Sequence, residues 1–209
     1  MRIKLKNFWQ SEFTEHEDVM ALTRQQLATP FEKLLEAATD CIEAGGKIFF
    51  FGNGGSASDA QHLATELSAR YKKDRKAIAA LSLATDTSAL TAIGNDYGFE
   101  RVFSRQIEAL GRKGDMAIGI TTSGNSPNVL KALELCRDMG ITTVGFTGQT
   151  GGKAAPLCDI LLNVPSLTTA RIQEMHITLG QMLCGALEIN LGYIEQEDPA
   201  TSQSLARAV

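Results

Sequence analysis

The stretch KIFFFGNGGSASDAQHLATE, residues 47–66, constrains the fold of this chain more than any other. A short apolar run breaks into a turn rich in Gly, Asn and Ser and then into a helical pattern, which predicts a strand, a loop and a helix N-terminus. Glycines leave the amides of the turn unobstructed, and Ser56 and Ser58 add hydroxyl groups beside the helix start. Because helix N-termini attract anions, the stretch predicts a phosphate-binding loop.

His62 and Glu66 follow this loop, four residues apart on the predicted helix. That spacing places both side chains on one face of the helix, and both residue types can transfer protons or hold a metal ion. A pair at this spacing can also be an ordinary surface contact worth about 0.2 to 0.5 kcal/mol. Its position directly after an anion-binding loop favours a functional interpretation.

Two other phosphate-loop types fit less well. The string GNGGSA matches the loose dinucleotide pattern G-x-G-x-x-G/A, but the acidic ribose ligand expected about 20 residues further on is missing. A Walker loop is excluded because no Gly-Lys-Ser/Thr follows.

Composition limits the partners of the chain. Its 209 residues are 44% apolar and 21% charged, which suits one compact domain, and a net charge of −4 argues against a nucleic-acid partner. No apolar run is long enough to span a membrane, and the N-terminus is too polar for a signal peptide. We therefore expect a cytoplasmic protein without a nucleic-acid or membrane partner. The scattered cysteines, which lack C-x-x-C spacing, are expected to be buried free thiols: Cys41, Cys136, Cys158 and Cys184.

The remaining pattern alternates strands with helices. Two helices are expected over residues 7–44, with Thr29 as an N-cap before Pro30, and His16 is expected on a solvated face. A turn is expected at residues 94–98. Further strands are predicted at 77–83, 116–120, 142–146 and 160–164, and a long apolar helix at 170–191.

This order predicts an α/β protein in which flanking helices wrap both faces of a doubly wound, five-stranded parallel sheet. We expect a helical arm over residues 1–45, a phosphate-binding α/β domain over 46–194 and a flexible tail over 195–209. The apolar residues of the arm favour packing on another subunit.

A second loop, TTSGNSP at residues 121–127, repeats the strand, hydroxyl-rich turn and helix start of the first. Both loops follow strands of one parallel sheet, whose ligands bind at the carboxyl ends. Hydroxyl groups of both loops are therefore expected to converge on one small anion: Ser56, Thr121, Ser123 and Ser126. With no Lys or Mg²⁺ motif beside it, the phosphate is expected to be a handle for binding rather than the bond that breaks.

The segments GNGGSASDAQH, TELSARY, ATDTSALTAIGNDYGFERVFSRQ, TTSGNSPNVL and ARIQEMHI resemble the phosphoheptose isomerase family of the sugar isomerase (SIS) fold, from Gly46 to Gly192. The resemblance implies isomerisation of D-sedoheptulose 7-phosphate, a phosphorylated seven-carbon sugar, to D-glycero-D-manno-heptose 7-phosphate, which leads toward lipopolysaccharide. It also implies a homotetramer with active sites at subunit interfaces, and zinc in many members.

The resemblance implies functional roles for the residues of this chain that match the family's motifs. Glu66 matches the base that moves a proton between C1 and C2, and His62 and Gln173 match metal and substrate ligands. Asn95 and Asp96 match residues that contact the sugar. The remaining matches are loop positions that bind substrate or its phosphate: Asn53, Gly54, Gly55, Ser56, Thr121, Thr122, Ser123 and Ser126.

One position departs from the family. Where members usually carry a second histidine that binds metal and transfers protons, this chain has Gln181. An amide cannot transfer a proton near neutral pH and should hold zinc less firmly than imidazole does, so zinc occupancy is in doubt at a site of His62, Glu66, Gln173 and Gln181. We assign nearby His176 a structural role.

The departure keeps a second class of function open. A bacterial protein of the same fold binds the replication initiator without known isomerase chemistry, and ARIQEMH resembles it as well. That relative lacks the equivalent of Glu66, whereas this chain keeps both Glu66 and the full glycine loop.

Overall fold

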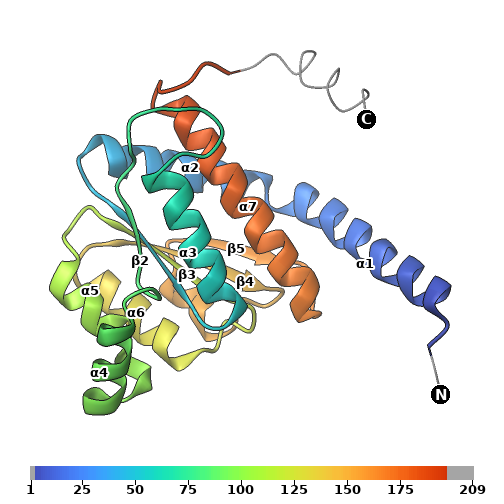
Figure 1. The fold of residues 1–209 in the computed structure, drawn as a ribbon, viewed down its shortest axis with the longest axis horizontal. Helices are drawn as coiled ribbons and strands as arrows, with labels where there is room; N and C mark the ends of the chain where they lie inside the picture. The colour runs from blue at the N-terminus through green and yellow to red at the C-terminus, as the bar shows by residue number, and fades with distance from the viewer. Residues whose placement is uncertain (1–2, 197–209) are drawn as a thin grey trace.

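The computed structural model describes residues 3–196, which form a parallel sheet covered by helices on both faces (Figure 1). The sheet order is β2-β1-β3-β4-β5, and every neighbouring pair is parallel. The predicted five-stranded, doubly wound architecture is confirmed. The strands are β1 (Ile48–Gly52), β2 (Ala80–Ser82), β3 (Met116–Thr121), β4 (Thr142–Gly148) and β5 (Ile160–Val164).

Helices pack on the two faces of the sheet in separate groups. Phe50 and Ile118 point into a core shared with α2, α3 and α7, while Phe49 and Ala117 point into a second core shared with α5 and α6. Burial on both faces explains why β1 is apolar throughout rather than alternating. The helices are α1 (Leu5–Gln26), α2 (Ala28–Glu43), α3 (Gly55–Ser68), α4 (Thr87–Tyr97), α5 (Ser104–Leu110), α6 (Pro127–Asp138) and α7 (Thr169–Asn190), with 3₁₀ turns η1 (Phe99–Arg101) and η2 (Gly152–Leu157).

Several local predictions were wrong at element ends. The chain breaks between α1 and α2 at Leu27, so Thr29 is not the N-cap but lies in the first turn with Pro30, where a missing N–H costs nothing. The turn expected at 94–98 is instead the last part of α4, which ends at Gly98 with φ 87°. Strand β2 is shorter than residues 77–83.

The cysteine prediction is largely confirmed. Cys41, Cys136 and Cys184 are buried free thiols, whereas Cys158 is a free thiol that is only partly buried. Of the predicted tail, residues 197–209 lie outside the described residues. None of the helices within residues 3–196 has the length and hydropathy needed to cross a bilayer.

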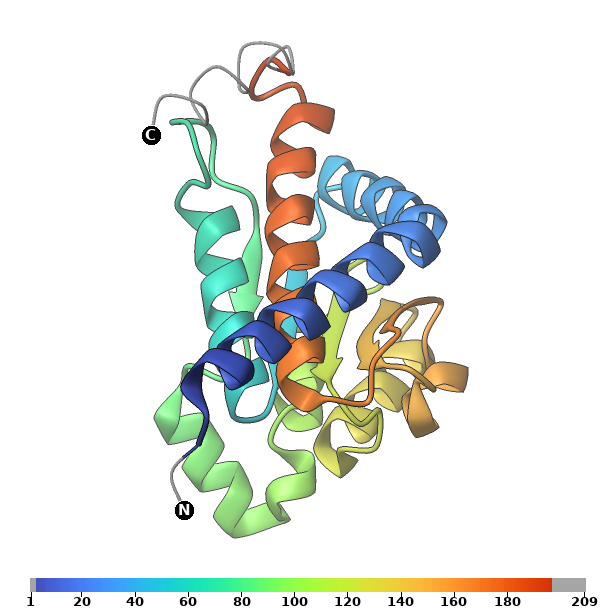
Figure 2. The same ribbon diagram turned by 90° about the vertical axis from the view of Figure 1, so that its right-hand side faces the viewer.

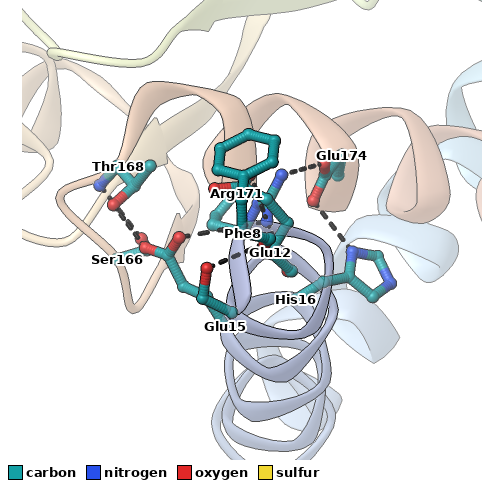
Figure 3. Close-up of polar contacts among 9 residues, drawn as sticks. Phe8, Glu12, Glu15, His16, Ser166, Thr168, Arg171 and Glu174 are labelled. Atoms are coloured by element: carbon teal, nitrogen blue, oxygen red, sulfur yellow. Dashed lines mark hydrogen bonds and ion pairs between the residues drawn. The ribbon is translucent and has the colours of Figure 1, made fainter. Parts of the chain in front are cut away.

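Helix α1 lies across α7, as Figure 2 shows, and the two are joined by a polar cluster around Arg171 (Figure 3). The buried Arg171 guanidinium donates to the carbonyl oxygen of Glu12 at 2.7 Å and to the carboxylate of Glu174 at 2.6 Å. His16 Nδ1 lies 2.8 Å from the other carboxylate oxygen of Glu174. His16, which was predicted to face solvent, has a side chain that is 36% exposed, but its helix packs on α7 and the ring contacts Glu174.

Helices α3 and α7 approach each other closely because a glycine stands at their contact. A Cβ placed on Gly180 of α7 would lie 2.4 Å from Leu63 Cδ1 of α3, too close for any real side chain. The contact brings the turn that carries His62 and Glu66 beside the turn that carries Gln181.

We expect Gly180→Ala to lower the free energy of unfolding by about 1 to 3 kcal/mol, because the added methyl overpacks the α3–α7 contact. Gly94→Ala in α4 is the matched control, because the added Cβ would meet only Val102, at 3.8 Å. Alanine is the better helix former, so this variant should raise the free energy of unfolding by up to about 1 kcal/mol. Urea unfolding of both variants measures the difference. Equal effects would show that the close approach does not require glycine.

Candidate functional site

The two hydroxyl-rich loops lie side by side at the carboxyl edge of the sheet. Strands β1 and β3 are direct neighbours, with Gly52 opposite Ile120, so the loops that follow them start from adjacent points. The amides of Asn53 and Asn128 exchange two hydrogen bonds, each of 2.8 Å, and tie one loop to the helix after the other. The two loops are therefore adjacent, as expected for turns that follow neighbouring strands of one parallel sheet.

Hydroxyl groups and helix N-termini line this edge. Thr121 Oγ1 lies 3.0 Å from Ser126 Oγ, and Ser126 is the N-cap residue of α6 yet makes no side-chain cap. Ser56 is 4% exposed in the first turn of α3, beneath the end of β1. Gly54 caps α3 with φ 57°, and a glycine cap leaves the first amides of the helix free of a side-chain acceptor. Together these groups could bind an anion through neutral hydrogen-bond donors and two helix dipoles.

The other predicted loop residues complete the second turn. Thr122 accepts the amide of Gly148 on its carbonyl oxygen at 3.0 Å, which ties the turn to the end of β4. Ser123 Oγ accepts the amide of Asn125 at 3.1 Å and is exposed. Gly124, with φ 65°, packs against Gly151, where an added Cβ would lie 2.1 Å from the Gly151 carbonyl oxygen. The turn is thus held by its backbone, and the Ser123 side chain faces outward.

His62 and Glu66 form the predicted pair on α3. His62 Nε2 lies 2.9 Å from Glu66 Oε1, and the two side chains are 48% and 19% exposed. Asp59, one turn earlier, is a third ionisable group on this helix, and burial raises the pKa of its carboxyl while His62 opposes the shift. The sequence analysis overlooked Asp59, although its spacing of three residues from His62 is visible in the sequence.

Gln173 reaches the loop from α7. A Cβ on Gly55 would lie 2.6 Å from Gln173 Nε2, so the glutamine amide rests directly on the N-terminus of α3. A side chain at position 55 would therefore have to displace the end of Gln173. Gln181, two turns further along α7, is partly buried and lines a cavity together with Tyr71 and Gly185.

Asn95 and Asp96 bond to each other at the end of α4. Both are exposed in the last turn of α4, and Asn95 Nδ2 donates to Asp96 Oδ1 at 2.8 Å. Within residues 3–196, no hydrogen bond joins either of them to the turns after β1 and β3.

The donors present fit a zinc ion poorly. Within the described part of the chain, no three or more His, Cys, Asp or Glu side chains gather where they could hold a metal ion. Cys184 is the thiol that interacts with Glu66; it is buried, and burial raises its pKa to about 12. The predicted set therefore contains one imidazole and one carboxylate, and its remaining members, Gln173 and Gln181, are amides.

Asn128 is a functional candidate that sequence reasoning missed. It is 2% exposed and fixes the side chain of Asn53, which the resemblance marks as a substrate residue. The sequence does carry a signal for this residue, because Asn128 is polar and stands at the second position of α6. In the structure it lies among the buried residues of that helix.

The geometry agrees with comparisons to known proteins. The SIS domain family model matches residues 13–148. Phosphoheptose isomerase of Paramagnetospirillum magneticum is 58% identical over 186 residues, which cover 89% of this chain and 97% of that protein. The chain belongs to the phosphoheptose isomerase family. A Helicobacter pylori phosphoheptose isomerase is 52% identical and covers 86% of the chain and 93% of its own length.

Solved structures of this family share the fold. Phosphoheptose isomerase GmhA from Neisseria gonorrhoeae is 44% identical with a TM-score of 0.84, covering 88% of this chain and 99% of that one. A phosphoheptose isomerase from Francisella tularensis is 34% identical with a TM-score of 0.86, covering 88% and 98%. Family membership therefore rests on sequence and structure together.

His176 lies under the site in a structural position. Its side chain is fully buried, and Nε2 donates to the carbonyl oxygen of Thr147 at 3.0 Å. Among the described residues Nδ1 has no hydrogen-bond partner. Burial lowers the pKa of His176 to about 4. This placement agrees with the structural role that the sequence analysis gave it.

We expect His176 to make the fold sensitive to acid. Its folded pKa of about 4 lies below the ordinary value near 6.5, so between these pH values the unfolded chain binds a proton that the folded chain does not. The free energy of unfolding should fall by up to about 3 kcal/mol as pH drops through this window. His176→Gln, whose amide can donate to Thr147, should lose that part of the dependence in urea unfolding at pH 7 and pH 4. Equal losses in both proteins would contradict the assignment.

Proposed function

We propose that this chain interconverts D-sedoheptulose 7-phosphate and D-glycero-D-manno-heptose 7-phosphate through an enediol. The observation that carries the proposal is the His62–Glu66 contact of 2.9 Å on α3, the helix whose N-terminus forms part of the hydroxyl-lined edge. One helix thus joins an anion site to a carboxylate able to act as a base. Family membership supports the same reaction.

The phosphate is bound as a handle in this proposal. Thr121, Ser126 and Ser56 offer hydroxyl groups, and α3 and α6 offer amides at their N-termini, so the cradle holds the dianion without changing it. Thr122, Ser123, Asn53, Gly54 and Gly55 belong to the same two loops. Asn95 and Asp96 are assigned to the sugar by resemblance alone.

Glu66 carries the proton in the proposed reaction. Its carboxylate removes a proton from C1 of the ketose while O2 gains a proton, which gives the C1–C2 enediol. The same carboxyl group then returns its proton to C2 as O1 loses a proton and C1 becomes the aldehyde. The proton that O1 loses replaces the one that O2 gained, so substrate and product are isomers. His62 holds the carboxylate through the contact of 2.9 Å. Gln173, over the N-terminus of α3, is placed to donate to a sugar oxygen.

The same proposal includes an assembly and a location. Helix α1 exposes a row of large apolar side chains, with Trp9 63% and Phe13 50% exposed, which a second subunit would cover. We assign this face to a homotetramer, in keeping with the family resemblance. A phosphorylated sugar substrate places the chain in the cytoplasm, at a step toward lipopolysaccharide heptose.

We expect purified protein to isomerise sedoheptulose 7-phosphate. Glu66→Gln removes the base and should lower kcat by about 10²- to 10⁴-fold. Gln181→His restores a third strong zinc ligand and should increase both zinc affinity and turnover. Turnover assays with and without added zinc, together with zinc measured on the purified proteins, test both variants.

Ser126→Ala is the matched control for this experiment. It removes one hydroxyl of the cradle and should raise KM for the phosphosugar while kcat stays within about threefold, because the handle is bound equally in ground and transition states. Absence of turnover in the native protein and in every variant, with phosphosugar still bound, would contradict the isomerase. That outcome would favour the non-catalytic alternative, a protein that binds the replication initiator.

A further inference from the structure

The helix that carries Glu66 ends two residues later, at Ser68, and its last carbonyl groups need partners from outside the helix. Arg75 supplies them. Its Nη2 donates to the carbonyl oxygen of Glu66 at 2.7 Å, and its Nη1 donates to the carbonyl oxygens of Leu67 at 2.7 Å and Ala69 at 3.2 Å. One guanidinium therefore closes the C-terminal turn of α3 and binds the backbone of the proposed base directly.

Arg75 is itself fixed by Glu188 of α7. Arg75 Nε donates to Glu188 Oε1 at 2.7 Å, and the backbone amide of Tyr71 donates to the same oxygen at 3.1 Å. The two side chains are 1% and 0% exposed, so the pair is fully buried. A planar guanidinium presents its donors in a rigid fork, and that shape lets one side chain reach a carboxylate and several carbonyl oxygens at once.

These contacts join the two helices of the proposed site at the end remote from the phosphate cradle. Helix α3 carries His62 and Glu66, and α7 carries Gln173 and Gln181. A small displacement of a reacting group is enough to reduce catalysis about 100-fold. We infer that Arg75 and Glu188 are positioning residues, which hold the last turn of α3 against α7 and so set the place of the Glu66 carboxylate; the inference rests on the proposed function.

Arg75→Lys tests this inference in the full-length protein. Lysine keeps the positive charge beside Glu188 but cannot make the parallel bonds to the carbonyl oxygens of Glu66 and Leu67. We expect kcat to fall about 10- to 100-fold while KM for sedoheptulose 7-phosphate stays within about threefold, because the cradle lies at the other end of α3. Glu188→Gln keeps an oxygen for Arg75 and Tyr71 but removes the charge that fixes the guanidinium, so kcat should fall, though less than in Arg75→Lys.

A second buried ion pair provides the matched control. Lys47 Nζ lies 2.6 Å from Asp115 Oδ2, with the aspartate 3% exposed, and both residues directly precede the strands β1 and β3 at the opposite edge of the sheet. Asp115→Asn should reduce thermal stability but leave kcat within about twofold of the native value. If Asp115→Asn lowers kcat as much as Arg75→Lys does, or if Arg75→Lys leaves kcat unchanged, the inference is overturned.

Amide hydrogen exchange gives a readout that does not need turnover. In Arg75→Lys, exchange across residues 62–69 should be faster than in the native protein, while exchange across α6 stays the same. Unchanged exchange across residues 62–69 would overturn the inference. If the native protein does not isomerise the sugar, the proposed function fails, and hydrogen exchange still decides whether Arg75 holds this turn.

Discussion

The carboxyl ends of parallel strands lie at the same edge of a sheet. In this chain β1 and β3 are neighbouring strands, with Gly52 opposite Ile120. Every other feature of the candidate anion site depends on this pairing. It sets two hydroxyl-rich turns beside each other, and the reciprocal amide bonds of Asn53 and Asn128 then lock them together. The cradle is thus a consequence of strand order, because the two turns are far apart in the sequence.

The second constraint is the packing of α3 against α7. Three contacts follow one another along the pair: Gly55 beneath Gln173, Leu63 against Gly180, and Arg75 with Glu188. Glycine permits the second by leaving out a side chain, the first brings the end of Gln173 onto the start of α3, and a buried ion pair fixes the third. The candidate site residues of α3 and α7 therefore lie on two helices that contact each other at both ends and in the middle.

The sequence predicted what periodicity and turn chemistry control locally. The parallel sheet, the two loops and the His62–Glu66 face followed from apolar runs, glycine turns and helical spacing, and the structure agrees. Contacts between distant segments were not predictable in this way. His16 looked solvated because its neighbours in sequence are acidic, yet Glu174 lies 158 residues away in the chain and 2.8 Å away in space. The roles of Asn128, Arg75 and Glu188 depend on partners of the same kind.

The chemistry of the cradle agrees with a reaction that leaves the phosphate untouched. The phosphate ester is the same in substrate, transition state and product, so groups that bind only the transition state would not speed the reaction at this position. Neutral hydroxyls and helix amides are therefore sufficient to bind the phosphate. Stabilisation specific to the transition state is needed where the proton moves, and the His62–Glu66 pair stands on the same helix beyond the cradle. Because Gln173 and Gln181 are amides, His62 and Glu66 are the members of the predicted set that can accept or donate a proton near neutral pH. In the proposed reaction the proton is carried by Glu66, and it is the backbone carbonyl oxygen of Glu66 that Arg75 binds.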